Sequence, residues 1–97
     1  MTNTTTPTTI DNDFAPETHT VGNTSAQSGV ITTGSGLIRI AVTTHAHIKF
    51  GSNPTATEED LLMPTDHVEV FRFKSGDKIA FIGHGAGSGE INISAID

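Results

Sequence analysis

Apolar and polar side chains alternate without a break along residues 38–50. The apolar or small residues on one face are Ile38, Ile40, Val42, Thr44, Ala46, Ile48 and Phe50. The intervening positions include Arg39, His45, His47 and Lys49. A period of two predicts half-buried β-structure. Because thirteen residues are long for one strand, the segment is expected to divide into strands 36–43 and 45–50, with a bend near Thr43 and Thr44.

The remaining pattern predicts more short strands, at 18–24, 29–33, 67–74, 78–83 and 90–96, separated by turn residues at 51–54, 75–77 and 83–89. Residues 55–66 are expected to form a loop, in which Thr57 to Asp60 can cap a single helical turn that Pro64 ends. No long segment has apolar residues at the helical period of 3.6, so no long helix is predicted. The pattern therefore predicts an all-β fold, a small antiparallel β-sandwich of jelly-roll or immunoglobulin-like type with six to eight strands.

The predicted strand 67–74 is apolar on both sides. Val68 and Val70 share one side, and Phe71 and Phe73 share the other. Such a strand is either central in its sheet or close to a subunit contact. Phe71 and Phe73 are therefore candidate partner-binding residues.

Residues 1–28 are expected to form an extended N-terminal arm, and residues 29–97 the β-sandwich domain. The arm contains nine threonines, and its large apolar residues are Met1, Ile10, Phe14 and Val21. It cannot bury enough apolar area to offset its ordering entropy, so it needs a partner surface. Ile10, Phe14 and Val21 are the predicted anchors.

Composition excludes several classes of function. Cysteine is absent, which rules out disulfides and thiolate metal sites. The net charge is −6, and the five basic residues do not cluster, so direct nucleic-acid binding is not expected. No apolar stretch approaches the length of a membrane span, and the threonine-rich N-terminus is unlike a secretory signal. Synthesis inside the cell, in the cytoplasm, is expected.

The sharpest chemical motif is His45-x-His47. Two imidazoles at positions i and i+2 of a strand point the same way and can share a metal ion. A third ligand has to come from elsewhere, and the candidates are His67, His84, Glu90, Asp66 or a symmetry mate. The same pair is also typical of a polar face or a subunit contact. The spacing alone does not assign a metal, so no cofactor is predicted and His45 and His47 stay weak candidates.

No enzymatic site is predicted. The glycine-rich stretch 83–89 precedes a strand rather than a helix, and it lacks the lysine of a phosphate-binding loop. The acidic run Glu58, Glu59 and Asp60 fits a solvated loop or a cation site better than a catalytic pair. No nucleophile elbow accompanies the many hydroxyl residues.

Residues 37–94 carry a longer pattern. Its segments are 37–44 (LIRIAVTT), 48–57 (IKFGSNPTAT), 62–64 (LMP), 70–73 (VFRF), 76–82 (GDKIAFI) and 91–94 (INIS). The most specific of these is FGSNPTAT at 50–57. The pattern resembles short β-sandwich virion proteins of tailed bacteriophages. The arm lies outside the resemblance, and the His45-x-His47 pair departs from it.

The resemblance implies a non-enzymatic capsid decoration, or cement, protein on the outer surface of the virion. Its partners would be the major capsid protein and copies of itself in a dimer or trimer. Two alternatives remain open: a head–tail connector or tail protein, and a module that binds host-surface glycans. The absence of Trp and Tyr weighs against the glycan alternative, because sugar sites usually stack a ring on an aromatic face.

Overall fold

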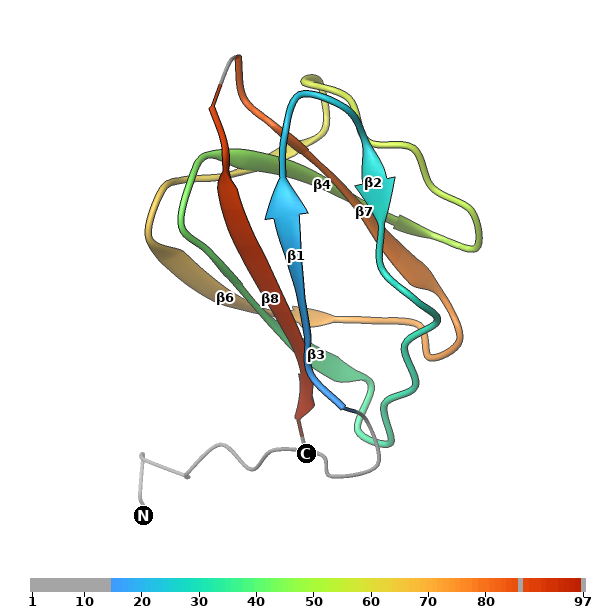
Figure 1. Ribbon diagram of the computed structural model, residues 1–97. Coiled ribbons are helices and arrows are strands. Elements are labelled where there is room, and N and C mark those ends of the chain that lie inside the picture. Colours follow the sequence, from blue (N-terminus) through green and yellow to red (C-terminus); the bar gives the residue numbers. More distant parts are fainter. Residues whose placement is uncertain (1–14, 86, 97) are drawn as a thin grey trace.

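The computed structural model describes residues 15–85 and 87–96. This part of the chain forms eight strands in two four-stranded sheets, ordered β1-β8-β3-β6 (sheet A) and β2-β7-β4-β5 (sheet B) (Figure 1). The strands are β1 Glu17–Val21, β2 Ala26–Gln27, β3 Leu37–Val42, β4 Ala46–Gly51, β5 Leu61–Met63, β6 His67–Arg72, β7 Lys78–Gly83 and β8 Gly89–Ile96. The prediction of an all-β sandwich with six to eight strands is confirmed.

The strands pair in a nested order. β4 pairs with β5, β3 with β6, β2 with β7 and β1 with β8, all antiparallel. The strand order is therefore that of one long hairpin folded over on itself. Pairing of β3 with β8 and of β4 with β7 completes the two sheets. That nesting is the jelly roll, and it decides between the two sandwich types that the pattern left open.

The core is the apolar layer between the sheets. Along β3, Ile38, Ile40 and Val42 are buried and the residues between them are half-exposed, as the alternation predicts. The buried cluster comprises Val21, Ile31, Ile38, Ile40, Val42, Ala46, Ile48, Met63, Phe73, Ile79, Phe81, Ile91, Ile93 and Ala95. Both sheets therefore hold together by burial of one apolar face each, worth about 1.5–3 kcal/mol per large side chain.

The segment between β3 and β4 carries the chain from one sheet to the other. The predicted division of residues 38–50 into two strands is confirmed, with β3 ending at Val42 and β4 beginning at Ala46. The two strands belong to different sheets, however, so Thr43 and Thr44 lie in a connection between sheets rather than in a bend of one strand.

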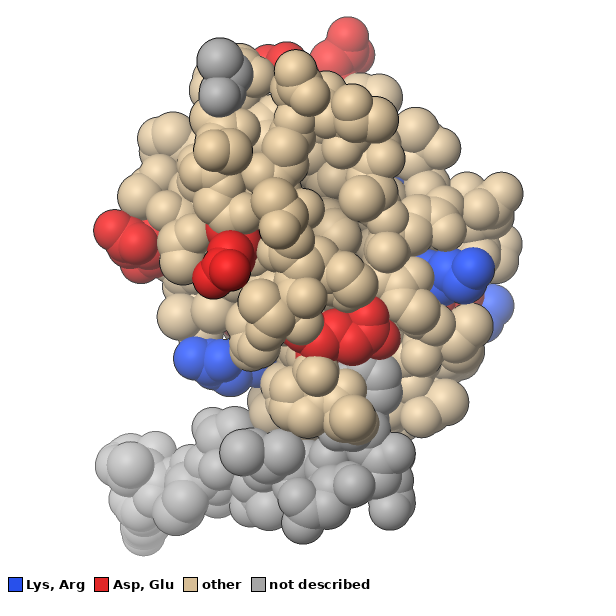
Figure 2. Space-filling view, in the orientation of Figure 1, with Lys and Arg blue, Asp and Glu red and all other residues tan. Residues whose placement is uncertain are grey.

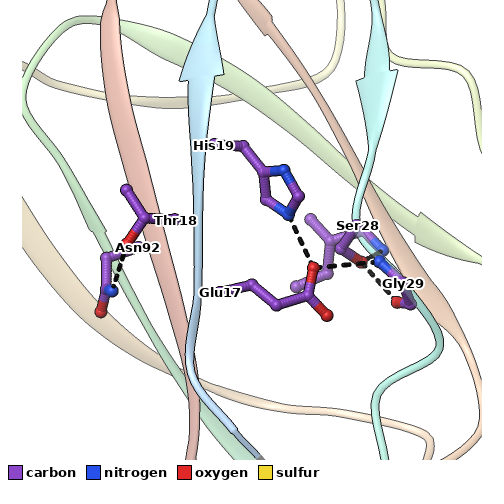
Figure 3. Close-up of polar contacts among 7 residues, drawn as sticks. Glu17, Thr18, His19, Ser28, Gly29 and Asn92 are labelled. Atoms are coloured by element: carbon purple, nitrogen blue, oxygen red, sulfur yellow. Dashed lines mark hydrogen bonds and ion pairs between the residues drawn. The ribbon is translucent and has the colours of Figure 1, made fainter.

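The first strand, β1, brings part of the predicted arm into the sandwich. Thr18 and Asn92 are cross-strand partners on β1 and β8, and the Asn92 amide donates to the Thr18 hydroxyl at 3.0 Å. On the other side of β1, the Glu17 carboxylate accepts from the Gly29 N–H at 3.1 Å and contacts His19 Nε2 at 2.6 Å (Figure 3). The arm boundary at residue 28 is thus too late for the described part of the chain, because β1 and β2 belong to the two sheets.

Two further local expectations differ from the structure. Residues 29–33 are not a strand. Ser28 continues the pairing of β2 with β7, but the Ile31 N–H donates to the Asp77 backbone carbonyl, which is one residue out of that register. The predicted helical turn is replaced by a tight turn followed by β5. There the Asp60 carboxylate accepts from the Thr57 N–H at 2.8 Å, as in a capping box, but Leu61 pairs with Ile48 instead of continuing a helix.

The outer strands leave apolar side chains exposed at one side of the sandwich. β5 and β6 are edge strands of sheets B and A, and a short link joins them. Of the five large exposed apolar residues in the described part of the chain, four lie on these strands: Leu61, Leu62, Val68 and Val70. These four residues are called the apolar edge surface below.

Charged side chains are dispersed over the sandwich. Arg39, Lys49, Arg72 and Lys78 lie on four different strands. On the face drawn in Figure 2, basic groups stand apart from one another and acidic groups lie between them. That face therefore carries no single-sign stripe. The residues 15–85 and 87–96 include no helix of the length and hydropathy needed to cross a membrane.

Gly83 sits at a close approach of three chain segments, which yields a stability prediction. A Cβ at this position would lie 2.6 Å from the Gly87 carbonyl oxygen and 3.1 Å from that of Gly22. We expect Gly83→Ala to lower the free energy of unfolding by about 1–3 kcal/mol, because backbone has to move. Urea denaturation of the full chain measures this change.

Gly22→Ala is the matched control for that substitution. A Cβ at Gly22 meets nothing within 4 Å. Its effect should be neutral or slightly stabilising, by less than about 1 kcal/mol. Equal denaturation midpoints for the two variants would contradict the packing described around Gly83.

Candidate functional site

Three histidines gather on the outer face of sheet B. The register places Ala46 opposite Gly83 and His47 opposite Ile82, and the His84 N–H donates to the His45 carbonyl at 3.2 Å. The pairing of β4 with β7 thus extends one residue past Gly83, with His84 opposite His45. Since directly opposite residues share a face, His45, His47 and His84 all point away from the core.

His47 is buried although it points outward from its sheet. The residue is 4% exposed, in contrast to the exposed Lys49 on the same face. Nδ1 lies 2.9 Å from the Asp60 carbonyl oxygen, and Nε2 lies 2.9 Å from His84 Nδ1. A carbonyl oxygen can only accept, so Nδ1 carries the hydrogen in the neutral ring. The lone pair of Nε2 is therefore aimed at His84.

The loop of residues 52–60 covers this face of sheet B and accounts for the burial of His47. It leaves the end of β4, and the Pro54 carbonyl accepts from the Gln27 amide at 2.6 Å. The Ala56 N–H then donates to the Ser25 hydroxyl at 2.9 Å. Pro54 and Ala56 are buried, and so is Ala80 on the outer face of β7. The loop reaches Glu58 and Asp60 beside His47 before β5 begins.

Glu58 closes the cluster from the loop side. Its Oε1 lies 3.7 Å from His84 Nδ1 and accepts from the Gly85 N–H at 3.3 Å. Gly85 has a φ of 63°, a left-handed conformation that glycine adopts without strain. This turn directs His84 and the Gly85 N–H toward the same carboxylate. One ligand atom each from His47, Glu58 and His84 lies within 4.8 Å of the others.

The structure brings only some of the predicted metal ligands together. His47 and His84 come together, whereas the ring of His45 stands edge-on to that of His84, with centroids 6.1 Å apart. His45 Nδ1 accepts from the Thr65 N–H at 3.0 Å, so that nitrogen is already occupied. His67 pairs instead with Glu69 at 3.0 Å. Asp66 and Glu90 are not part of the cluster. Glu58 was expected only in a solvated loop or a cation site, and no periodic signal links it to His47.

The predicted partner-binding residues fall into three groups. Ile10 and Phe14 lie outside the described residues. Val21 is 1% exposed in the core between the sheets, so it is not an anchor for a partner; it lies on the inward side of β1, which alternates with the exposed Thr18 and Thr20. Phe73 is 5% exposed and packs edge-on against Phe50 at 5.2 Å. Phe71 is half-buried and contacts the same ring at 5.5 Å.

The hydrogen bond to Asp60 leads to a prediction about the tautomer of His47. In the metal-free protein at mildly alkaline pH, the neutral His47 ring should carry its hydrogen on Nδ1, because only a donor can satisfy the carbonyl. Long-range proton–nitrogen correlation NMR distinguishes the two ring nitrogens. A His47 ring protonated on Nε2 alone would contradict the arrangement, and the more exposed His67 serves as the reference.

The chain has no significant match among protein-family models, curated proteins or solved structures.

Proposed function

We propose that this chain is a structural protein of a phage virion, a decoration protein that binds the capsid from outside and has no enzymatic activity. In this proposal the N-terminal arm contacts the major capsid protein, and the sandwich contacts other copies of itself. The support is the sequence resemblance over residues 37–94 together with the jelly-roll topology. Jelly rolls also occur in lectins and in cupins, so the fold alone does not select a function.

The observation that carries the proposal is the apolar edge surface. Leu61 is 56% exposed, and Val68 and Val70 are 49% and 47% exposed. Burying one such side chain fully gains about 1.5–3 kcal/mol, so the isolated chain leaves that stabilisation unrealised. Val68 and Val70 lie on the outer face of sheet A and Leu62 on that of sheet B. Exposed apolar side chains on both edge strands at one side of a small domain are typical of a protein contact.

The outer face of sheet A adds to this surface. Val68 stands opposite Ala41 of β3, and Val70 stands opposite Arg39. Ala41 and Arg39 are half-exposed, and the aliphatic stem of an arginine readily covers apolar surface. We assign this region to the contact between copies, because a closed symmetric oligomer brings the same surface of each copy together and buries apolar side chains at its centre.

Val70→Glu tests the contact between copies. The new carboxylate faces Arg39 across the ladder, so the fold should lose less than about 1 kcal/mol. A charge in an apolar contact has to be desolvated, and the oligomer should dissociate. Sedimentation velocity of the purified full chain should show a monomer for Val70→Glu at concentrations where the unaltered chain is oligomeric.

Thr20→Lys is the matched control on the opposite edge strand. Thr20 is exposed on the same outer face, and the new ammonium would face Glu90 across the ladder. Its sedimentation should equal that of the unaltered chain. A monomeric unaltered chain, or equal behaviour of both variants, would count against the role of the apolar edge surface.

Removal of residues 2–14 tests the arm. Because both sheets lie within residues 17–96, the shortened chain should keep the fold and its denaturation midpoint. Removal of residues 1–28 would instead take β1 and β2 from the sandwich. We expect the chain lacking 2–14 to lose co-sedimentation with undecorated phage capsids by at least about tenfold in apparent affinity, since avidity multiplies each lost contact. Unchanged capsid binding would refute the role of the arm.

Copy number separates decoration from the connector alternative. A decoration protein is present in hundreds of copies per particle, whereas a connector occupies a ring of a dozen or fewer. Quantitative gel densitometry of purified virions against the major capsid protein measures this ratio.

A further inference from the structure

We propose that His47, His84 and Glu58 bind one divalent transition-metal ion of the zinc class on the outer face of sheet B. The observations behind this site do not depend on the proposed virion role. The ion would join β4, the turn after β7 and the loop of residues 52–60. His47 would supply Nε2, His84 would supply Nδ1, and Glu58 would supply a carboxylate oxygen.

The separations of the donor atoms fit such an ion. Zinc binds histidine nitrogen at about 2.0–2.1 Å and carboxylate oxygen at about 2.0–2.2 Å, which puts two tetrahedral ligands roughly 3.3 Å apart. The separation between the His47 and Glu58 ligand atoms is within 4.8 Å, and the other two lie on either side of the ideal value. They are 2.9 Å between His47 Nε2 and His84 Nδ1, and 3.7 Å between His84 Nδ1 and Glu58 Oε1. Small rotations of the exposed His84 and Glu58 side chains bring both to the ideal distance.

The buried ligand is already oriented by a partner of its own. Metal-bound histidines usually donate their other ring N–H to a backbone carbonyl or a carboxylate, which fixes the ring and its tautomer. The Asp60 carbonyl does this for His47, which is 4% exposed. The lone pair of Nε2 consequently points at the place where the other two ligands meet. The Gly85 N–H likewise holds Glu58 Oε1 beside His84, and this oxygen keeps a second lone pair for the ion.

The ligand types select the class of ion. Two imidazoles and one carboxylate suit zinc, cobalt or nickel, whereas calcium and magnesium prefer sets made of oxygen alone. Three protein ligands leave a fourth position for water. In the metal-free chain, His84 Nδ1 carries the hydrogen that bonds His47 Nε2. When the ion binds, this hydrogen moves to Nε2 of the half-exposed His84 ring through solvent.

Titration calorimetry with zinc chloride tests the site directly. The protein is the full chain, with any affinity tag removed and with metals stripped by a chelator. One ion should bind per chain. His84→Ala and Glu58→Gln alter half-exposed side chains, so both variants should fold, and each should weaken zinc binding by at least about 10–100-fold.

His67→Ala is the matched control. His67 and Glu69 form a second histidine–carboxylate pair, at 3.0 Å on β6, with no third ligand at metal-binding distance among the described residues. This variant should bind zinc as the unaltered chain does. No measurable zinc binding would overturn the proposal and leave a plain hydrogen bond between His47 and His84. Equal binding by His84→Ala, or loss of binding in His67→Ala, would also overturn it.

Two further measurements test the geometry of the site. Cobalt in a four-coordinate nitrogen and oxygen site absorbs visible light strongly, so the unaltered chain should gain a visible band that His84→Ala lacks. Zinc should also raise the melting temperature of the unaltered chain in a concentration-dependent way, because a ligand that binds only the folded state stabilises it. A cobalt complex without the tetrahedral band, or a melting temperature that does not respond to zinc, would contradict this geometry.

Discussion

The register of β4 against β7 is the constraint on which most of this structure depends. Ile48 stands opposite Phe81, and Phe50 opposite Ile79, on the side that faces the core. A shift of one residue would turn these side chains of β4 to the outer face, at about 1.5–3 kcal/mol for each large apolar group. The same shift would also separate His47 from His84. Apolar burial on one face of sheet B therefore positions the polar cluster on the other.

The edge strands show how a small sandwich exposes apolar residues without its edge strands pairing with those of another copy. β1 and β6 are the edges of sheet A, and each carries a histidine–glutamate pair on the side that faces sheet B. Inward-pointing charges at an edge oppose the addition of a further strand, because those charges would lose water. The exposed Val68 and Val70 of β6 point the other way, outward from the sheet. Contact across the sheet face is thus favoured over extension of the sheet.

The alternation of apolar residues predicted the strands that have one apolar face, and it predicted them well. Residues 38–50 contain enough isoleucine and valine to show the period of two, and β3 and β4 follow from it. The pattern could not show that the chain changes sheets at Thr43 and Thr44, because residues on each side of the link alternate in the same way. Sheet membership depends on pairing with β7 and β8, which are distant in sequence.

Polar strands and loop-borne ligands were harder to predict. β1 has Val21 as its only core residue, so the sequence predicts a strand at 18–24 but assigns it to the arm instead of the sandwich. Glu58 reaches His47 through a loop whose path depends on single contacts, such as the bond between Pro54 and Gln27. The histidine pair itself was recognisable from its spacing. Its true partner could be chosen only once the β4–β7 register placed His84 beside it.

The loop of residues 52–60 links the metal-binding proposal to the apolar edge surface. Ordering such a loop costs about 1–2 kcal/mol per residue, which burial of Pro54 and Ala56 and a few hydrogen bonds offset only in part. The loop runs directly into β5, where exposed Leu62 stands opposite His47. Any ligand that holds Glu58 against His84 therefore also holds the start of β5 in its register. The cluster that we assign to an ion therefore also orders β5, which carries Leu61 and Leu62 of the apolar edge surface. Metal binding and the contact between copies should consequently influence each other.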